Sequence, residues 1–562
     1  MKIKILAILI ALLPFGGCTD LNLNPLSEGS SDTWYSNEVE IEMSLYELYR
    51  DVFWKVDQND WNDDWVRRGE TNPITSGTIT GEWSVIEDVW SLTYKAISRS
   101  NRLLEKLELL KDVLPEETLK KFIAEARFHR ASQYSKLISH WGDVVYFDKS
   151  LDIKESFNLS KTDKSIILQT IYDDYDNAAS FLPLSYGSSE KKRATKGAAF
   201  AMKARIALYM GDYETARDAA EACINLGQYQ LYPDFGELFL SSTKNPVETI
   251  FGLPRSTELG VYFSDTKNYI PRTAGGFATN DPSWECFCSF LCTDGLPIDE
   301  SPLFNPRLPF KNRDPRCTAT IVEFQTAHLG INYQPHPDSL KCYNFNTGTY
   351  VKNNDNRANS TYASYNGLVY KKGVDEDWND DFMAANDIII MRYADVLLMY
   401  AEAKIELNEI DVSVLNSINQ VRARAYKVNV SQIASYPAIQ TTNQNELRKI
   451  VRIERRMEFV LEGTRYMDII RWKLAEKVLN IPNYGMLDVT LLRKNVVKKG
   501  LWFFPATPEI DEDGIADFSV LFNTSLIKLL GNRTFDVSRQ YLWPIPSKEI
   551  LINPKLKQNL GY

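Results

Sequence analysis

Aromatic rings stand beside acidic, amide and basic side chains in one segment near the N-terminus, residues 57–68, which reads DQNDWNDDWVRR. Aromatic faces pack against the apolar C–H faces of pyranose rings, and planar polar groups hydrogen-bond paired hydroxyls. A run of Asp and Asn disfavours the interior of a helix, which favours an exposed loop here. Trp61, Asp64, Trp65 and Arg67 are therefore candidate ligand-binding residues.

These rings also allow a purely structural interpretation. Trp54, Trp61 and Trp65 are spaced seven and four residues apart, which would place them on one buried face of a helix. The sequence leaves both interpretations open.

Other aromatic residues lie in segments without helical periodicity and are further ligand-binding candidates. They are Trp83, Trp284, Tyr343, Tyr350 and Trp378. The remaining large rings lie in apolar runs, and we expect them to pack in the core. They are Trp90, Trp141, Trp472, Trp502 and Trp543.

An alternating acidic segment, residues 375–381, has part of the pattern of a calcium loop. Its candidate ligands are Asp375, Asp377, Asn379 and Asp381. The sixth and twelfth positions hold Asp380 and Asn386 in place of the Gly and Glu of that loop. A solvated acidic loop is the favoured interpretation, and we expect neither a metal nor a cofactor.

The sequence offers little for catalysis. It contains no nucleophile elbow and no phosphate-binding glycine loop, and its four histidines are not in metal-ligand spacing. A glycoside hydrolase needs only two carboxylates, and 74 acidic residues leave that class open.

The cysteines are too few for a disulfide scaffold at this length. Cys286, Cys288 and Cys292 lack paired C-x-x-C spacing and are expected to pack in the core, whereas Cys317 and Cys342 could pair or remain free.

The composition is that of a globular protein rather than a fibre, a disordered chain or a polytopic membrane protein. The 562 residues are 44% hydrophobic and 25% charged, with a formal net charge of -10. An acidic chain without a long basic run is a poor nucleic-acid binder. Aromatic residues reach 12%, and a surplus of rings often lines binding surfaces.

The first residues have the pattern of a bacterial lipoprotein signal. Lys2 and Lys4 precede an apolar stretch, and Gly16-Gly17 precede Cys18. We expect residues 1–17 to be removed, Cys18 to be lipidated and residues 18–36 to form a tether to lipid. An ordinary signal peptide followed by a chance cysteine is the alternative.

Helical periodicity dominates residues 37–232 and returns in residues 386–562. It is clearest over 116–141, 204–222, 393–403 with 414–425, 446–462 and 466–478. Residues 233–385 are rich in Pro, Gly and Asn and lack it. We predict a mainly α fold, in which tetratricopeptide-like helical hairpins carry a large, irregular, ligand-facing insertion and an irregular tail.

Several motifs, in order along the mature chain, resemble one family. Residues 453–472 read IERRMEFVLEGTRYMDIIRW, and residues 542–562 read LWPIPSKEILINPKLKQNLGY. Residues 125–131 (EARFHRA) and 391–403 (MRYADVLLMYAEA) fit the same pattern. The chain thereby resembles the SusD/RagB outer-membrane lipoproteins.

This resemblance implies a cell-surface, lipid-anchored protein of the outer membrane that binds glycan without turnover. It also implies a partner, a SusC-like TonB-dependent transporter that receives the ligand. A binder of peptides or other nutrients on the same scaffold is the first alternative, and a lipid-anchored glycoside hydrolase is the second. The charged residues of the 453–472 motif are expected to be structural, because they lie within a few turns of one helix, where opposite charges can pair.

Overall fold

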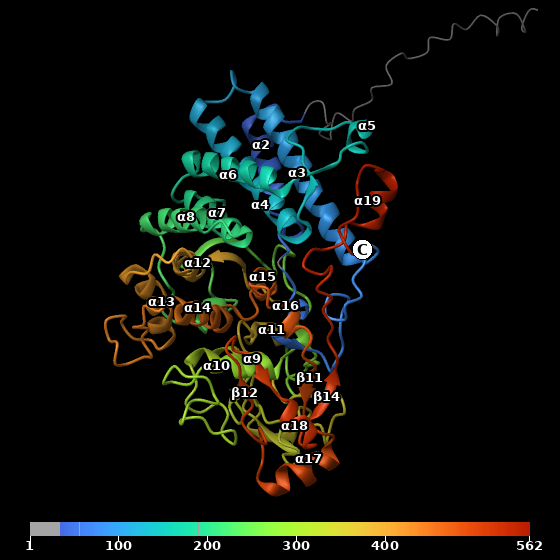
Figure 1. Cartoon of the computed structure of the whole chain (residues 1–562), viewed down its shortest axis with the longest axis vertical. Coiled ribbons are helices and arrows are strands. Elements are labelled where there is room, and N and C mark those ends of the chain that lie inside the picture. The colour runs from blue at the N-terminus through green and yellow to red at the C-terminus, as the bar shows by residue number, and fades with distance from the viewer. Residues whose placement is uncertain (1–33, 56, 188–189, 191) are drawn as a thin grey trace, which may run out of the picture.

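The computed structural model describes residues 34–55, 57–187, 190 and 192–562. The predicted signal peptide, Cys18 and the tether as far as residue 33 lie outside the described residues. The N-terminal helices form the upper part of the molecule in Figure 1, the insertion and much of the tail form the lower part, and the end of the tail with α19 returns to the upper part. Among the described residues, none of the helices combines the length and the hydropathy needed to cross a bilayer.

The N-terminal helices are α2 (Glu38–Glu47), α3 (Ser84–Leu109), α4 (Glu116–Trp141), α6 (Lys164–Phe181), α7 (Lys196–Met210) and α8 (Tyr213–Asn225), with the short α5 (Ile153–Ser156) between α4 and α6. From α3 onward the long N-terminal helices pack each against the next, and α2 packs on α4. Helix α4 has the bounds predicted for it: it follows Pro115 and stops at Gly142, whose φ is +72°. Helices α7 and α8 are joined by Gly211 in the left-handed conformation and by Asp212, which caps α8.

The second helical group continues this layer. Helix α12 (Tyr393–Glu406) packs on α8 and on α13 (Val412–Ala425) and α14 (Gln444–Phe459). Helix α14 ends three residues earlier than predicted, and the chain then turns through Leu461 and Gly463, both with positive φ. The predicted helix over 466–478 is two pieces, α15 (Arg465–Arg471) and α16 (Ala475–Val478). The mainly α fold with helical hairpins is confirmed.

The insertion begins and ends at one antiparallel strand pair. Strand β4 (Thr249–Leu253) pairs with β10 (Ile388–Arg392), so the two ends of the segment between them meet at the helical layer. The elements inside are short, as the missing helical period predicts. They are β5 (Asp281–Pro282), α9 (Trp284–Ser289), α10 (Pro315–Thr320), the sheet of β6 (Ala327–His328), β7 (Ile331–Asn332), β8 (Lys341–Asn344) and β9 (Thr349–Lys352), and α11 (Asp377–Asp380).

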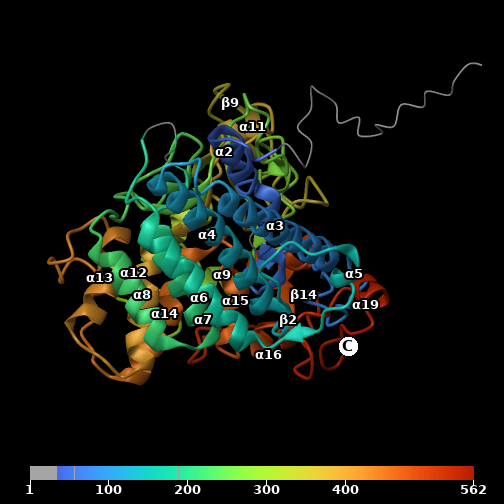
Figure 2. The same ribbon diagram turned by 90° about the horizontal axis from the view of Figure 1, so that it is seen from above.

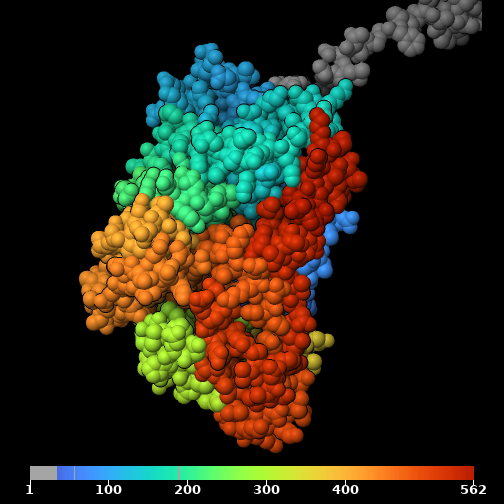
Figure 3. All heavy atoms as spheres, in the orientation of Figure 1, coloured from blue at the N-terminus to red at the C-terminus, as the bar shows by residue number. Residues whose placement is uncertain are grey.

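The tail packs on the insertion and then returns to the N-terminal helices. Its elements include β11 (Asn483–Gly485), α17 (Val489–Asn495), β12 (Glu509–Ile510), β13 (Ala516–Asp517), α18 (Ser519–Asn523), β14 (Lys528–Gly531) and α19 (Ser547–Ile552). Rings of the insertion and the tail share one core, in which Trp284 contacts Phe504 and Phe518. On the face seen in Figure 3 the orange-to-red C-terminal part forms a continuous band along the molecule, and Figure 2 shows α19 beside α5.

Helix α14 carries charged side chains into the centre of the protein. Arg455 binds Asp395 of α12 at 2.7 Å and Asp468 of α15 at 3.0 Å. Glu458 accepts from Arg392 at 2.7 Å and from Arg316 at 2.9 Å. These side chains are almost completely buried, as the structural interpretation of the motif predicts.

Three guanidinium groups converge on the single carboxylate of Glu458. Burial alone would raise the pKa of Glu458, but the nearby Arg424, Arg392 and Arg316 outweigh it and hold that pKa well below its usual range. Each of these cations was removed from water on folding, and each pairs with at least one other carboxylate besides Glu458, such as Glu248 for Arg392 and Arg424.

Replacing this carboxylate by its neutral isostere should destabilise the protein strongly. Glu458→Gln leaves buried positive charge uncompensated, so we expect the free energy of unfolding to fall by about 3–5 kcal/mol in urea titrations at pH 7. Because the folded-state pKa is lowered, the contribution exists above the unfolded pKa of about 4.3 and is lost as the pH falls below it. The difference between wild type and variant should therefore shrink in acid.

Glu116→Gln is the matched control, since the Glu116 side chain is 80% exposed and, among the described residues, pairs only with Lys120. That change should cost less than about 1 kcal/mol. Equal losses for the two variants would contradict a special role for the buried group.

Candidate functional site

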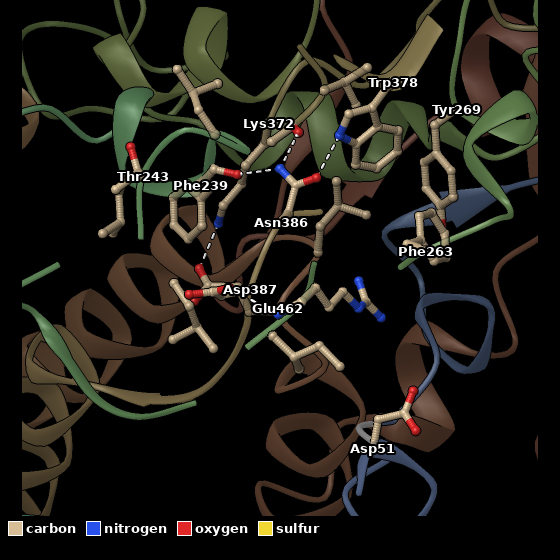
Figure 4. Close-up of a pocket in the computed structure, with 18 of the residues that line it drawn as sticks. Asp51, Phe239, Thr243, Phe263, Tyr269, Lys372, Trp378, Asn386, Asp387 and Glu462 are labelled. Atoms are coloured by element: carbon tan, nitrogen blue, oxygen red, sulfur yellow. Dashed lines mark hydrogen bonds and ion pairs between the residues drawn. The ribbon is translucent and has the colours of Figure 1, made fainter. Parts of the chain in front are cut away.

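A pocket of about 410 Å³ lies where the helical layer meets both ends of the insertion (Figure 4). Four chain segments form it: residues 51–55 with 58–59, residues 238–269, residues 372–389 and residues 461–462. The β4–β10 pair brings the second and third segments together, and the end of α14 supplies the fourth. The volume falls within the range of small-molecule sites, roughly 300–1,000 Å³.

One side of the pocket is aromatic. Figure 4 shows Phe263, Tyr269 and Trp378 together there, with Phe239 and Thr243 on the other side. The ring centroids of Phe263 and Trp378 are 5.5 Å apart, and those of Tyr269 and Trp378 are 6.0 Å apart. Phe263 and Tyr269 remain half-buried, whereas Trp378 is buried. On this side of the pocket Phe263 and Tyr269 are therefore the rings that a ligand can reach most easily.

Asn386 holds this wall in place. Its side-chain Oδ1 accepts a hydrogen bond from Trp378 Nε1 at 2.7 Å, and its Nδ2 donates to the carbonyls of Phe239 at 2.7 Å and Gly373 at 2.9 Å. The amide thus ties the two ends of the insertion to each other and fixes the Trp378 ring.

The acidic groups of the pocket are mostly paired. Asp387 accepts from Lys192 and from Lys244, the latter at 3.2 Å. Burial alone would raise the pKa of Asp387, but the bond from Lys192 and the charges of both lysines lower it. The carboxylate is therefore ionised and neutralised at neutral pH.

Glu462 is paired in the same way. It binds Lys372 at 2.6 Å and Arg392 at 2.6 Å. Burial lowers the pKa of Lys372 to about 8, although the charge of Glu462 acts against that shift. Because Arg392 also binds Glu458, it connects this wall of the pocket to the buried charged residues around α14.

Three of the predicted ligand-binding tryptophans are in the core, and that prediction is wrong for them. Trp61, Trp65 and Trp284 expose 3%, 8% and 1% of their surface. Trp61 lies edge-on to Tyr466 and Trp543. The helix-face alternative is also wrong, because residues 59–61 form a 3-10 turn and Trp65 begins β1 (Trp65–Val66), which pairs with β5.

The acidic residues of this segment are buried because they pair with arginines that lie far away in the sequence. Asp64 binds Arg456 of α14 at 2.7 Å, and Asp63 binds Arg456 at 2.8 Å and Arg465 at 2.9 Å. Asp64 is therefore a structural residue, a correction to its predicted role. Arg67 is partly exposed and pairs with Glu70 at 3.2 Å. Neither lines the pocket.

The other aromatic candidates divide between three places. Trp83 is half-buried and lies edge-on to Trp61, away from the pocket. Trp378 lines the pocket. Tyr343 and Tyr350 face each other across β8 and β9 with centroids 5.4 Å apart, and Tyr350 is 69% exposed. With Phe345 they form an aromatic group on the surface of this hairpin, separate from the pocket.

The calcium candidates are not gathered around a common point. Asp375 accepts from the backbone N of Ser241 at 2.7 Å and from its Oγ at 3.1 Å, while Asp377 and Asn379 lie within α11 and Asp381 follows it. The described residues contain no group of three or more His, Cys, Asp or Glu side chains placed to hold a metal ion. Cys317 and Cys342, whose pairing the sequence left open, are both free and buried.

Sequence reasoning missed most of the pocket. Arg255, Phe263 and Tyr269 carry no motif and lie near the start of the loop-rich stretch, whereas Asn386 lies directly after its end. The only available signal was the composition of residues 233–385, which indicated a functional insertion without indicating which rings meet.

Comparison with known proteins agrees with the fold. The model of the SusD family matches residues 254–562, which is more than half of the chain, and a model described as starch-binding, associating with outer membrane, matches residues 33–208. SusD-like protein P2 of Formosa agariphila is 25% identical over 588 aligned positions, covering 100% of this chain and 99% of the relative.

Solved structures show the same relationship. A SusD-like carbohydrate binding protein from Bacteroides fragilis is 29% identical, with a TM-score of 0.76 over 93% of this chain and 99% of that one. A second SusD-like protein from the same species is 23% identical, with a TM-score of 0.73 over 95% and 99% of the two chains, and shows the same fold. The resemblance carried by the sequence motifs is thereby confirmed, and the chain belongs to the SusD family.

Proposed function

We propose that this protein binds glycan in the pocket between the helical layer and the insertion. The observation that carries the proposal is the meeting of two half-buried rings, Phe263 and Tyr269, with polar side chains in one cavity of sugar-accommodating size. A pyranose offers an apolar face to such rings and hydroxyls to such polar groups. The Bacteroides fragilis relative, itself described as carbohydrate binding, supports this choice of ligand.

Binding without turnover fits the charges of the pocket better than hydrolysis does. A glycoside hydrolase needs one carboxyl group whose pKa is raised so that it can act as an acid. Asp387 has a lowered pKa and two lysine partners, and both oxygens of Glu462 are held by cations. A peptide ligand is the second candidate, and product analysis with a mixed ligand panel separates the three classes.

We further propose that Cys18 is lipidated and anchors the protein to the outer membrane, facing the exterior. The short apolar stretch before Gly16-Gly17-Cys18 supports this. An anchored binder cannot itself move ligand across a membrane. A SusC-like TonB-dependent transporter is therefore the proposed partner, in agreement with a family model whose description names association with the outer membrane.

Removing a pocket ring should weaken glycan binding without unfolding the protein. For Tyr269→Ala we expect affinity for a bound oligosaccharide to fall about ten- to a hundredfold, corresponding to about 1–3 kcal/mol of lost stacking by analogy with bases on aromatic side chains. Isothermal titration calorimetry on the soluble chain from residue 34 onward would measure this.

Two variants serve as controls for that measurement. Tyr350→Ala removes an exposed ring outside the pocket and should leave the affinity unchanged. Trp284→Ala should lower the free energy of unfolding by about 3–5 kcal/mol while the folded fraction still binds. A loss confined to Tyr350→Ala would move the site to the β8–β9 hairpin.

Changing the lipidation site should release the protein from the membrane. Cys18→Ala removes the thiol to which lipid attaches, so the full-length variant should leave the outer-membrane fraction in a strain that lacks the transporter. Retention of the variant in that fraction would argue against lipid anchoring.

Gentle detergent extraction should co-purify a large β-barrel protein with the anchored chain. The expected partner is identified by mass spectrometry of the complex. Repeated recovery of the lipoprotein alone, under conditions that preserve other outer-membrane complexes, would count against the partnership.

A further inference from the structure

We infer that the pocket selects saccharides that carry an anionic group, a carboxylate or a sulfate, and that Arg255 recognises this group. The inference rests on the proposed function, because it specifies the chemical class of the glycan held in that pocket. It follows from Arg255, whose guanidinium is the only one among the described residues that lines the cavity.

Arg255 differs from the other arginines that reach the interior near the pocket. Arg392 binds Glu248, Glu458 and Glu462, each within 2.7 Å. Arg255 has no carboxylate within 4.0 Å among the described residues, and its Nε is buried without a hydrogen-bond partner there. A guanidinium taken partly out of water without a partner is unfavourable unless an anion arrives.

The acidic groups around the cavity are committed elsewhere. Asp387 is shared by Lys192 and Lys244, and Glu462 by Lys372 and Arg392. Asp51 is exposed and lies at the edge of the pocket in Figure 4, and Lys55, also exposed, lines the pocket as well. Arg255 is thus left without an ion-pair partner among the described residues, although Asp51 and Asp387 attract it from a distance.

The side chain of Arg255 is held in position from both ends. Its backbone N–H donates to Asp387 Oδ1 at 3.1 Å, and its guanidinium carbon lies 5.5 Å from the centre of the Phe263 ring. Stacking on Phe263 leaves the edge of the guanidinium plane free to donate paired hydrogen bonds to a carboxylate or sulfate.

The pKa of Arg255 supports this geometry. Burial lowers it, and the attraction of Asp51 and Asp387 does not restore it, so the guanidinium is charged but poorly solvated. An anionic sugar beside Phe263 would replace the lost hydration while its ring stacks on the aromatic wall.

The experiment compares ligands that differ only in charge. Oligogalacturonate is measured against its methyl ester, and carrageenan oligosaccharides against their desulfated forms, alongside neutral cello-, xylo- and malto-oligosaccharides. Calorimetry at about 0.15 M salt screens long-range attraction. We expect at least one anionic ligand to bind tenfold or more tightly than its neutral counterpart, and the pair that shows this identifies carboxylate or sulfate.

The variants assign that preference to one side chain. Arg255→Gln should remove the preference for the anionic ligand and leave affinity for the neutral counterpart within about twofold. Arg255→Lys should restore part of it, since charge returns without the planar fork. Arg68→Gln is the control, because Arg68 also stacks on a ring, that of Tyr362 at 5.0 Å, but does not line the pocket.

The outcomes separate this inference from the proposed function. If neutral glycans bind as tightly as anionic ones, and Tyr269→Ala abolishes that binding, the glycan site is retained but the role of Arg255 is overturned. Arg255→Gln weakening both ligands equally, with an unchanged thermal transition, would also overturn it. Wild-type protein that binds no member of the panel would overturn both.

Discussion

The fold depends on arginine–carboxylate pairs that are buried around helix α14. Arg455, Arg456 and Glu458 point from this one helix to partners in α12, in β10, in the insertion and in the segment before β1. Apolar packing alone is non-directional, whereas each of these pairs requires a specific partner in a specific geometry. The charged centre therefore specifies how the helical layer, the insertion and the N-terminal segment fit together, and an incomplete set would leave unpaired charge in the interior.

The pocket is where this charged centre reaches the surface. Arg392 binds Glu458 inside the protein and Glu462 at the pocket wall, and Lys372 binds Glu462 from the end of the insertion. The same interactions that close the fold thus make the wall rigid, which lowers the entropic cost of ordering a bound ligand. Because the network occupies the wall carboxylates Asp387 and Glu462, the half-buried rings and Arg255 are among the groups that remain for a ligand.

Local sequence patterns predicted the helices well because their boundaries have local causes. Helix 116–141 is set by Pro115 and Gly142, and the α7–α8 turn by Gly211 and Asp212. The tryptophans near residue 60 were predicted wrongly because their burial has a distant cause. Asp64 beside them pairs with Arg456, 392 residues away, and this pairing carries a polar segment into the core. The composition of the insertion indicated that it is functional. The contact between Phe263 and Trp378, however, depends on the pairing of the two ends of the insertion through β4 and β10, which no local sequence pattern predicts.

The pairing of β4 with β10 also explains why the proposed ligand-binding residues lie next to these two strands. Arg255 follows β4 by two residues, and Asn386 and Asp387 immediately precede β10. Side chains at these positions are held rigidly because they adjoin a strand pair. Arg392, the last residue of β10, fixes that pair by binding Glu248 and Glu458. The hairpin that carries Tyr350 lies farther out and pairs only within the small sheet of β6 to β9 in the part of the chain that the structure describes. A pocket built at the neck of the insertion therefore combines loop residues, which are free to differ in chemistry, with positions fixed by the buried charges of the scaffold.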